Sequence, residues 1–117
     1  MRNYQPKKNN NYKLDDSLFI RMKYLVKDYP RMKLTAENIT DRHLLELSSD
    51  NTMKFKKISE ECNAIDRALE DLPLEYQKPV FKNVCYDVPY PIDADRTTYG
   101  RWKCRFLWNI AKNLYYI

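Results

Sequence analysis

Residues 52–72 read TMKFKKISEECNAIDRALEDL, and this stretch is the clearest indication of the fold. Apolar residues recur in it at alternating steps of three and four, the spacing that places side chains on one face of an α-helix. This seam consists of Phe55, Ile58, Cys62, Ile65, Leu69 and Leu72. A heptad seam packs against another helix of the same chain or against its own copy in a homodimer through Phe55–Leu72, and we favour the first arrangement.

Helical patterns flank this seam on both sides. On the N-terminal side, apolar residues at helical spacing predict a helix over Asp16–Tyr29, which Pro30 should end. On the C-terminal side, Pro73 breaks the chain and suits the first turn of a helix over Leu74–Tyr86. Pro79 should kink this helix or restart it, because proline removes one backbone hydrogen bond.

The segment 31–50 has the weakest pattern. Thr40 and Asp41 are candidates to cap a short helix. That helix would hold Leu44, Leu45 and Leu47. The polar cluster Ser48–Asn51 is typical of a loop and of the cap of the next helix.

The last predicted helix, from about Arg96 to Leu114, follows a connection with two prolines, DVPYPIDA at residues 87–94. Asp93 and Asp95 are candidates for its N-cap. At roughly 100° per residue, its apolar side chains share one face. That face holds Tyr99, Trp102, Phe106, Leu107, Ile110 and Leu114, and another face holds Arg101, Arg105, Trp108 and Lys112. Lys103 falls on the apolar side, and its ammonium group is expected to snorkel outward.

Composition favours a small all-α domain. The chain has 117 residues, within the usual size of one domain, and a single glycine, Gly100. One glycine excludes a glycine-rich phosphate loop and argues against a hairpin-rich β fold, because both consume several glycines. No run of residues is long and apolar enough to span a membrane, and no signal peptide is visible.

Metal and catalytic sites have little support. The soft metal ligands are Cys62, Cys85, Cys104 and one histidine, His43. They lie about 20 residues apart, whereas zinc modules bring their ligands in closely spaced pairs. A nuclease that holds Mg²⁺ on Asp87, Asp93 and Asp95 is a further reading, although helix capping explains two of these carboxylates. We therefore expect no metal, no cofactor and no enzymatic activity, and the odd number of cysteines indicates a reduced cytoplasm.

Basic residues gather at the two ends of the chain. Residues 1–13 hold four basic and no acidic residues, and residues 95–117 hold five basic residues and one acidic residue. Residues 14–94 carry more acidic than basic side chains. This distribution is expected if both ends contact a polyanion, although a solvated surface with chance asymmetry is the alternative.

The last helix is the strongest candidate for such a contact. In a helix-turn-helix, the N-terminal residues of the second helix contact base edges in the major groove. Arginine suits guanine, and threonine suits a phosphate or a thymine methyl group. The candidate DNA-binding residues are Arg96, Thr97, Thr98, Arg101, Lys103, Arg105 and Lys112. Basic residues late in a helix also offset its dipole, and a basic amphipathic helix also suits a membrane or a partner protein.

A family resemblance points the same way. Thr98–Phe106 (TYGRWKCRF), continuing to Ile110–Leu114 (IAKNL), resembles the C-terminal end of RinA/ArpU-type regulators. These proteins are phage-encoded activators of late or packaging genes in Gram-positive hosts. Ile65–Leu69 (IDRAL), followed by Leu72-Pro73, is similar to the helix that leads into their DNA-binding half. The resemblance covers roughly residues 52–117.

The resemblance implies a helix-turn-helix like that of sigma-factor region 4. By that likeness Thr97, Thr98, Arg101 and Arg105 take the recognition role. The sequence departs from the family between Tyr86 and Arg96, where the chain is too short for a normal positioning helix. The motif is an abbreviated one, or the helix over Leu74–Tyr86 takes the positioning role itself.

These observations predict an all-α protein with an abbreviated helix-turn-helix-like C-terminal half. Residues 1–13 are expected to form a flexible basic arm, and residues 14–117 a single helical domain whose DNA-binding half is 52–117. The predicted function is sequence-specific regulation of transcription in the bacterial cytoplasm, as an activator of phage late or packaging genes. Its expected partners are double-stranded DNA and RNA polymerase, with no membrane contact. The alternative is a helical protein–protein interaction module without DNA binding, which would use the seam and the aromatic residues Trp108, Tyr115 and Tyr116.

Overall fold

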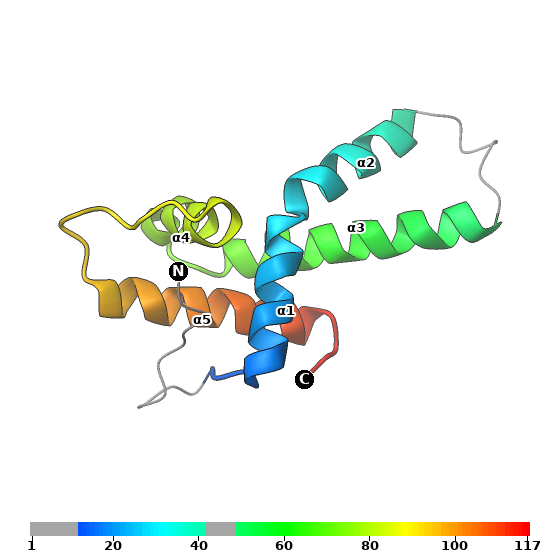
Figure 1. Cartoon of the computed structure of the whole chain (residues 1–117). Coiled ribbons are helices and arrows are strands. Elements are labelled where there is room, and N and C mark those ends of the chain that lie inside the picture. The colour runs from blue at the N-terminus through cyan, green and yellow to red at the C-terminus, as the bar shows by residue number, and fades with distance from the viewer. Residues whose placement is uncertain (1–11, 42–48) are drawn as a thin grey trace.

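The computed structural model describes residues 12–41 and 49–117, with the side chains of 38–41 and 49–52 excepted. Within these ranges the chain forms helices and no strand (Figure 1). The helices are α1 (Asp16–Lys27), α2 (Tyr29–Asp41), α3 (Ser49–Glu70), α4 (Leu74–Tyr86) and α5 (Arg96–Asn113). The predicted all-α fold is confirmed. The predicted arm lies almost wholly outside the described residues, as do Leu44, Leu45 and Leu47.

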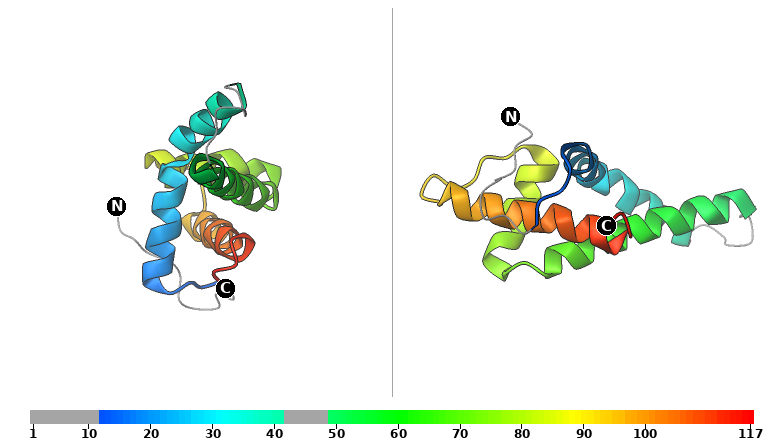
Figure 2. Two further views of the ribbon diagram at one scale, coloured as in Figure 1. Left: turned by 90° about the vertical axis from the view of Figure 1, so that its right-hand side faces the viewer. Right: turned by 90° about the horizontal axis from the view of Figure 1, so that it is seen from below.

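Helix α5 lies at the centre of the packing and contacts α1, α3 and α4. Figure 1 shows α1 crossing α3 and α5, while α2 and the first half of α3 extend away from this bundle as a helical hairpin. The two views in Figure 2 show the same long shape, and the molecule measures 50 × 28 × 24 Å along its principal axes. None of the described helices has the length and apolar character needed to cross a membrane.

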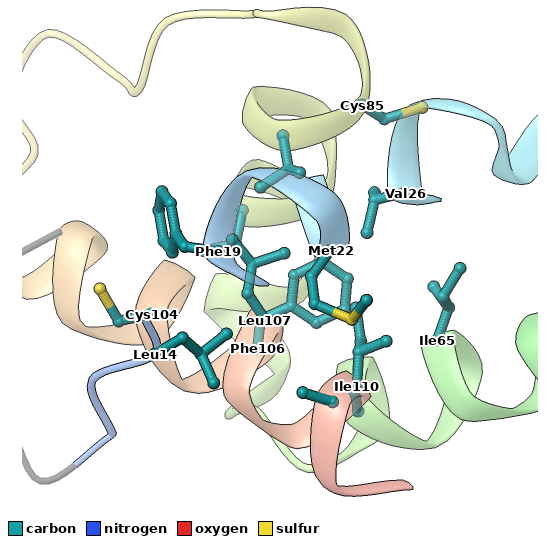
Figure 3. Close-up of a cluster of buried hydrophobic side chains, with 14 of the residues drawn as sticks. Leu14, Phe19, Met22, Val26, Ile65, Cys85, Cys104, Phe106, Leu107 and Ile110 are labelled. Carbon is teal, nitrogen blue, oxygen red and sulfur yellow. The ribbon is translucent and has the colours of Figure 1, made fainter. Parts of the chain in front are cut away.

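One hydrophobic core joins the five described helices. Phe106, Leu107 and Ile110 of α5 are fully buried, and Figure 3 shows them facing Phe19 and Met22 of α1. The other buried members of this cluster are Leu14, Val26, Met32, Cys62, Ile65, Ala68, Leu72, Val80, Val84, Cys85, Cys104 and Ala111. The core therefore forms where α1 crosses α5, and α3 and α4 close its remaining sides.

The heptad seam is used within the chain. Cys62, Ile65 and Leu72 are buried in this core, and Ile58 and Leu69 pack against it. The favoured intramolecular arrangement is confirmed for these residues. They are not available to a second copy, so the structure gives no support to a homodimer through Phe55–Leu72.

The predicted end of the first helix needs a correction. Helix α1 ends at Lys27, and the chain enters α2 at Tyr29, so Pro30 lies in the first turn of a new helix. Proline is tolerated there because the first-turn amides have no partner within their own helix. Hydrogen bonds at the junction support this turn, since the amide of Asp28 donates to the carbonyl of Leu25 at 3.1 Å, and Met32 donates to the carbonyl of Asp28 at 3.0 Å.

The weak pattern over residues 31–50 hid a full helix. Thr40 and Asp41 are the last residues of α2, and α3 begins at Ser49, within the cluster interpreted as a loop. The short helix predicted after Asp41 falls outside the described residues. A tertiary contact ties α2 to α3: the hydroxyl of Tyr29 donates to Asp66 at 2.6 Å, and Lys33 forms an ion pair with the same carboxylate at 3.3 Å. Packing on α3 therefore supports a helix that local periodicity did not indicate.

Prolines shape the connection between α3 and α4. Helix α3 ends at Glu70, two residues before the predicted Leu72, because the residue that precedes a proline avoids the helical region. Helix α4 runs through Pro79 as a single helix, so the expected restart does not occur. Val80 and Val84 are fully buried, and their packing compensates for the hydrogen bond that Pro79 removes.

Replacing Phe106 by alanine tests the central position of α5. Phe106→Ala leaves a cavity at the crossing of α1 and α5, and we expect it to lower the free energy of unfolding by about 3–5 kcal/mol. Urea denaturation followed by circular dichroism measures this. Leu34→Ala, at an exposed position of α2, is the matched control and should change stability by less than about 0.5 kcal/mol. Equal effects of the two variants would contradict this account of the core.

Candidate nucleic-acid interface

Helix α5 divides into an exposed N-terminal end and a buried C-terminal part. Arg96, Thr97 and Arg101 are exposed, whereas most side chains from Lys103 to Ala111 are buried. Figure 1 shows the first turns of α5 reaching toward one end of the molecule, away from the crossing with α1. The helix is therefore anchored by one half and presents the other to solvent.

Aromatic rings hold the first turns of α5 against α4 and the connection. The ring of Tyr76 on α4 stacks on Trp102 with centroids 5.6 Å apart and meets the edge of Tyr99 at 5.0 Å. Tyr90, in the connection, also packs on Tyr99, with the two ring centroids 4.8 Å apart. Burial raises the pKa of the Tyr90 hydroxyl above its ordinary value. The connection is thus folded down onto α5 at Tyr90.

Asp95 caps α5, as the sequence predicted. Its carboxylate accepts hydrogen bonds from the amides of Thr97 at 2.9 Å and Thr98 at 3.5 Å, and from the Thr98 hydroxyl at 2.9 Å. These bonds, with the one from the Thr98 hydroxyl first, hold the pKa of Asp95 below its ordinary value of 3.8. The first amides of α5 are therefore occupied by a carboxylate, so any contact with an anion at this end depends on side chains.

The middle of the predicted basic face is covered. Tyr12, which precedes α1, lies under the guanidinium of Arg105 at 4.6 Å and meets the edge of Trp108 at 5.1 Å. Lys112 follows, with its ammonium 5.2 Å from the Trp108 ring. The result is a ladder of cations and rings in which Arg105 and Trp108 are half-buried. No periodicity could have indicated Tyr12, because it lies outside any helix.

Lys103 does not reach outward as expected. It is only 8% exposed. Burial, followed by repulsion from Lys23 on α1, lowers the pKa of its ammonium group. The expectation of a snorkelling head is therefore wrong, because Lys103 is buried near α1, where Lys23 lies close enough to repel it.

The structure thus separates the predicted DNA-binding residues into groups. Arg96, Thr97 and Arg101 share the exposed end of α5, and Lys112 is exposed about 17 Å beyond Arg101 along the helix. Thr98 is engaged by the cap, and the other two, Arg105 and Lys103, are covered to different degrees. A surface that follows the whole basic face is therefore interrupted, and the exposed end is the candidate interface.

Cysteine and carboxylate side chains are dispersed. Cys62, Cys85 and Cys104 are each buried, and no group of three or more His, Cys, Asp or Glu side chains gathers within residues 12–41 and 49–117. Asp87 pairs with Lys27 at 2.8 Å, which holds the pKa of its carboxyl below the ordinary value. His43, the remaining member of the zinc set considered from the sequence, lies outside the described residues.

The aromatic residues named for a protein-interaction surface do not form one patch. Trp108 packs with Tyr12, and Tyr116 accepts a hydrogen bond from Arg21 at 3.0 Å while its ring lies under that guanidinium at 4.4 Å. Tyr115 remains 92% exposed. Most residues of the expected protein-interaction surface, from the seam and from these rings, therefore make contacts within the chain instead.

No protein-family model, curated protein or solved structure matches the chain. The likeness to RinA/ArpU-type regulators therefore rests on the sequence motifs alone.

Removal of the cap should loosen the candidate interface in a pH-dependent way. We expect Asp95→Ala to lower the melting temperature by a few degrees near neutral pH, because two amides and a hydroxyl lose their acceptor. Since the pKa of Asp95 is lowered on folding, its contribution is present above its ordinary pKa of 3.8 and is lost as the pH falls below that value. Thermal melts from about pH 7 down to about pH 3, a range that crosses the ordinary pKa of 3.8, would measure the shrinking difference. Asp93→Ala, an exposed carboxylate two residues earlier, should show neither effect.

Proposed function

We propose that the protein is a sequence-specific DNA-binding regulator of transcription that places the N-terminal end of α5 in the major groove. The observation that supports this most is the division of α5, with Arg96, Thr97 and Arg101 exposed on a helix whose side chains from Lys103 to Ala111 are mostly buried. Recognition helices contact base edges with their N-terminal residues, and the rest of the domain must hold them rigidly in place.

Each exposed residue suits a role in such a complex. Arg101, one turn into the helix, has the reach and the fork of donors that recognise guanine. Arg96, at the first position, suits a phosphate, and Thr97 suits a phosphate or a thymine methyl group. Because Asp95 occupies the first amides of α5, these side chains carry the contacts.

Helix α4 takes the positioning role in this proposal. It precedes α5 directly in the chain, and the connection Asp87–Asp95 contains no helix. Tyr76 joins the two helices through its contacts with Tyr99 and Trp102. The motif is then an abbreviated one, in which a short connection stands where a separate positioning helix is expected.

The biological setting of the proposal comes from the resemblance to RinA/ArpU-type regulators. By that likeness the protein activates phage late or packaging genes in the bacterial cytoplasm and contacts RNA polymerase. The proposal includes no metal, cofactor or enzymatic step. A helical interaction module without DNA binding is the rival, and DNA binding itself separates the two.

A salt titration of DNA binding tests the proposal first. Binding to a selected duplex should weaken steeply with salt, because each neutralised phosphate contributes about −0.9 to the slope of log K against log salt. We expect a slope steeper than about −3 and a clear preference over a scrambled duplex. Fluorescence anisotropy on both duplexes measures it. Equal, weak binding to the two duplexes would favour the rival.

A pair of arginine variants tests the assigned surface. Arg101→Ala should weaken specific binding by about 1–3 kcal/mol and relax the preference at one base pair. Arg67→Ala removes the same charge from an exposed position of α3 and should leave sequence preference unchanged. Unchanged melting temperatures would show that both variants are folded. If the two substitutions weaken binding equally, α5 does not carry the specificity.

A further inference from the structure

Ile92 has the largest exposed fraction of the large hydrophobic side chains in the described part of the chain. It lies in the connection between α4 and α5 and is fully exposed, at 102% of its reference surface. The transfer of a branched aliphatic side chain out of water lowers the free energy, so its complete exposure is unfavourable in the isolated molecule. Val88, in the same connection, is also partly exposed, at 41%.

The backbone around Ile92 is held on both sides. Two residues earlier, the ring of Tyr90 packs on Tyr99. Three residues later, Asp95 is fixed by its capping bonds to α5. Between them the amide of Ala94 donates to the carbonyl of Pro91 at 2.9 Å, which closes a turn with Ile92 at its corner. Ile92 is therefore projected outward by a constrained turn.

This turn adjoins the exposed end of α5. Figures 1 and 2 show the connection at the extreme end of the long axis, beside the first turn of the helix. Arg96 and Arg101 are exposed there, so the neighbouring charge favours a polyanion. Of the carboxylates in the connection, Asp87 is paired with Lys27, and Asp95 is turned to the first amides of α5 by its capping hydrogen bonds. In the proposed complex, the exposed carboxylate of Asp93 would suit the amino group of a cytosine in the major groove.

From this arrangement we infer that Ile92 is a second base-reading residue, which contacts the 5-methyl group of a thymine next to the bases contacted by α5. The inference rests on the proposed function and extends it from the helix to the connection. DNA offers one apolar group in the major groove, the thymine methyl, and it lies between phosphates that arginines bind. An aliphatic side chain on a constrained turn, next to a helix end with exposed arginines, matches that combination.

Replacement of thymine by uracil removes only this methyl group and therefore tests the inference. A duplex selected from a random pool by binding to the full chain would be prepared with each thymine replaced by uracil in turn. We expect one or two positions at which uracil weakens binding by about three- to tenfold. Ile92→Ala should weaken binding to the thymine duplex by a similar factor and become insensitive to uracil at those positions. Leu34→Ala, at an exposed position of α2, removes apolar surface elsewhere and should keep the uracil effect.

The outcomes separate the inference from the function on which it rests. If the wild-type protein binds the duplex but uracil has no effect, or if Ile92→Ala keeps the full uracil effect, Ile92 does not read a methyl group. If the wild-type protein binds no DNA, the proposed function fails and the inference fails with it. Because Ile92 is fully exposed, the variant should fold, and an unchanged melting temperature would establish this.

Discussion

The packing of the C-terminal half of α5 is the constraint on which the rest of the structure depends. At about 100° per residue, its buried side chains from Lys103 to Ala111 cover roughly 220° of the helix circumference. A surface helix commonly buries a stripe of little more than about 100°. Helix α5 is thus closer to a central helix than to a surface one, and α1, α3 and α4 take their places by packing around it.

This packing explains why the exposed basic residues are confined to the ends of α5. The buried arc includes Lys103, whose ammonium pKa is lowered by burial. Opposite the arc, the segment before α1 lays Tyr12 between Arg105 and Trp108. At the first turns, α4 and the connection cover only the face of Tyr99 and Trp102, and the side chains of Arg96 and Arg101 stay exposed. The same packing that orients α5 therefore selects which of its cations can meet a ligand.

The connection between α4 and α5 has a similar double role. Its prolines prevent a helix, and Tyr90 and Asp95 attach it to the first turns of α5. A connection held in this way loses little conformational entropy on binding, because its backbone is already constrained. In the proposed complex with DNA, the short connection and the helix end act as one rigid surface, with Ile92 beside the arginines.

Much of the fold could be predicted from the sequence, because the information was local. Apolar spacing located α3, α4 and α5 to within a few residues, the prolines marked the breaks, and Asp95 was among the predicted caps. Helix α2 was missed, since its support comes from Tyr29 and Lys33 on Asp66, a contact between residues far apart in the chain.

The sequence by itself therefore determined the helical class, the breaks and the basic character of the last helix. The tertiary structure decided which of the basic residues are exposed. The periodicity of a sequence predicts which face of a helix is apolar. It does not predict how many other helices pack around that helix. Because three helices and Tyr12 pack around α5, Lys103 and Arg105 are covered, while Arg96 and Arg101 remain in contact with solvent.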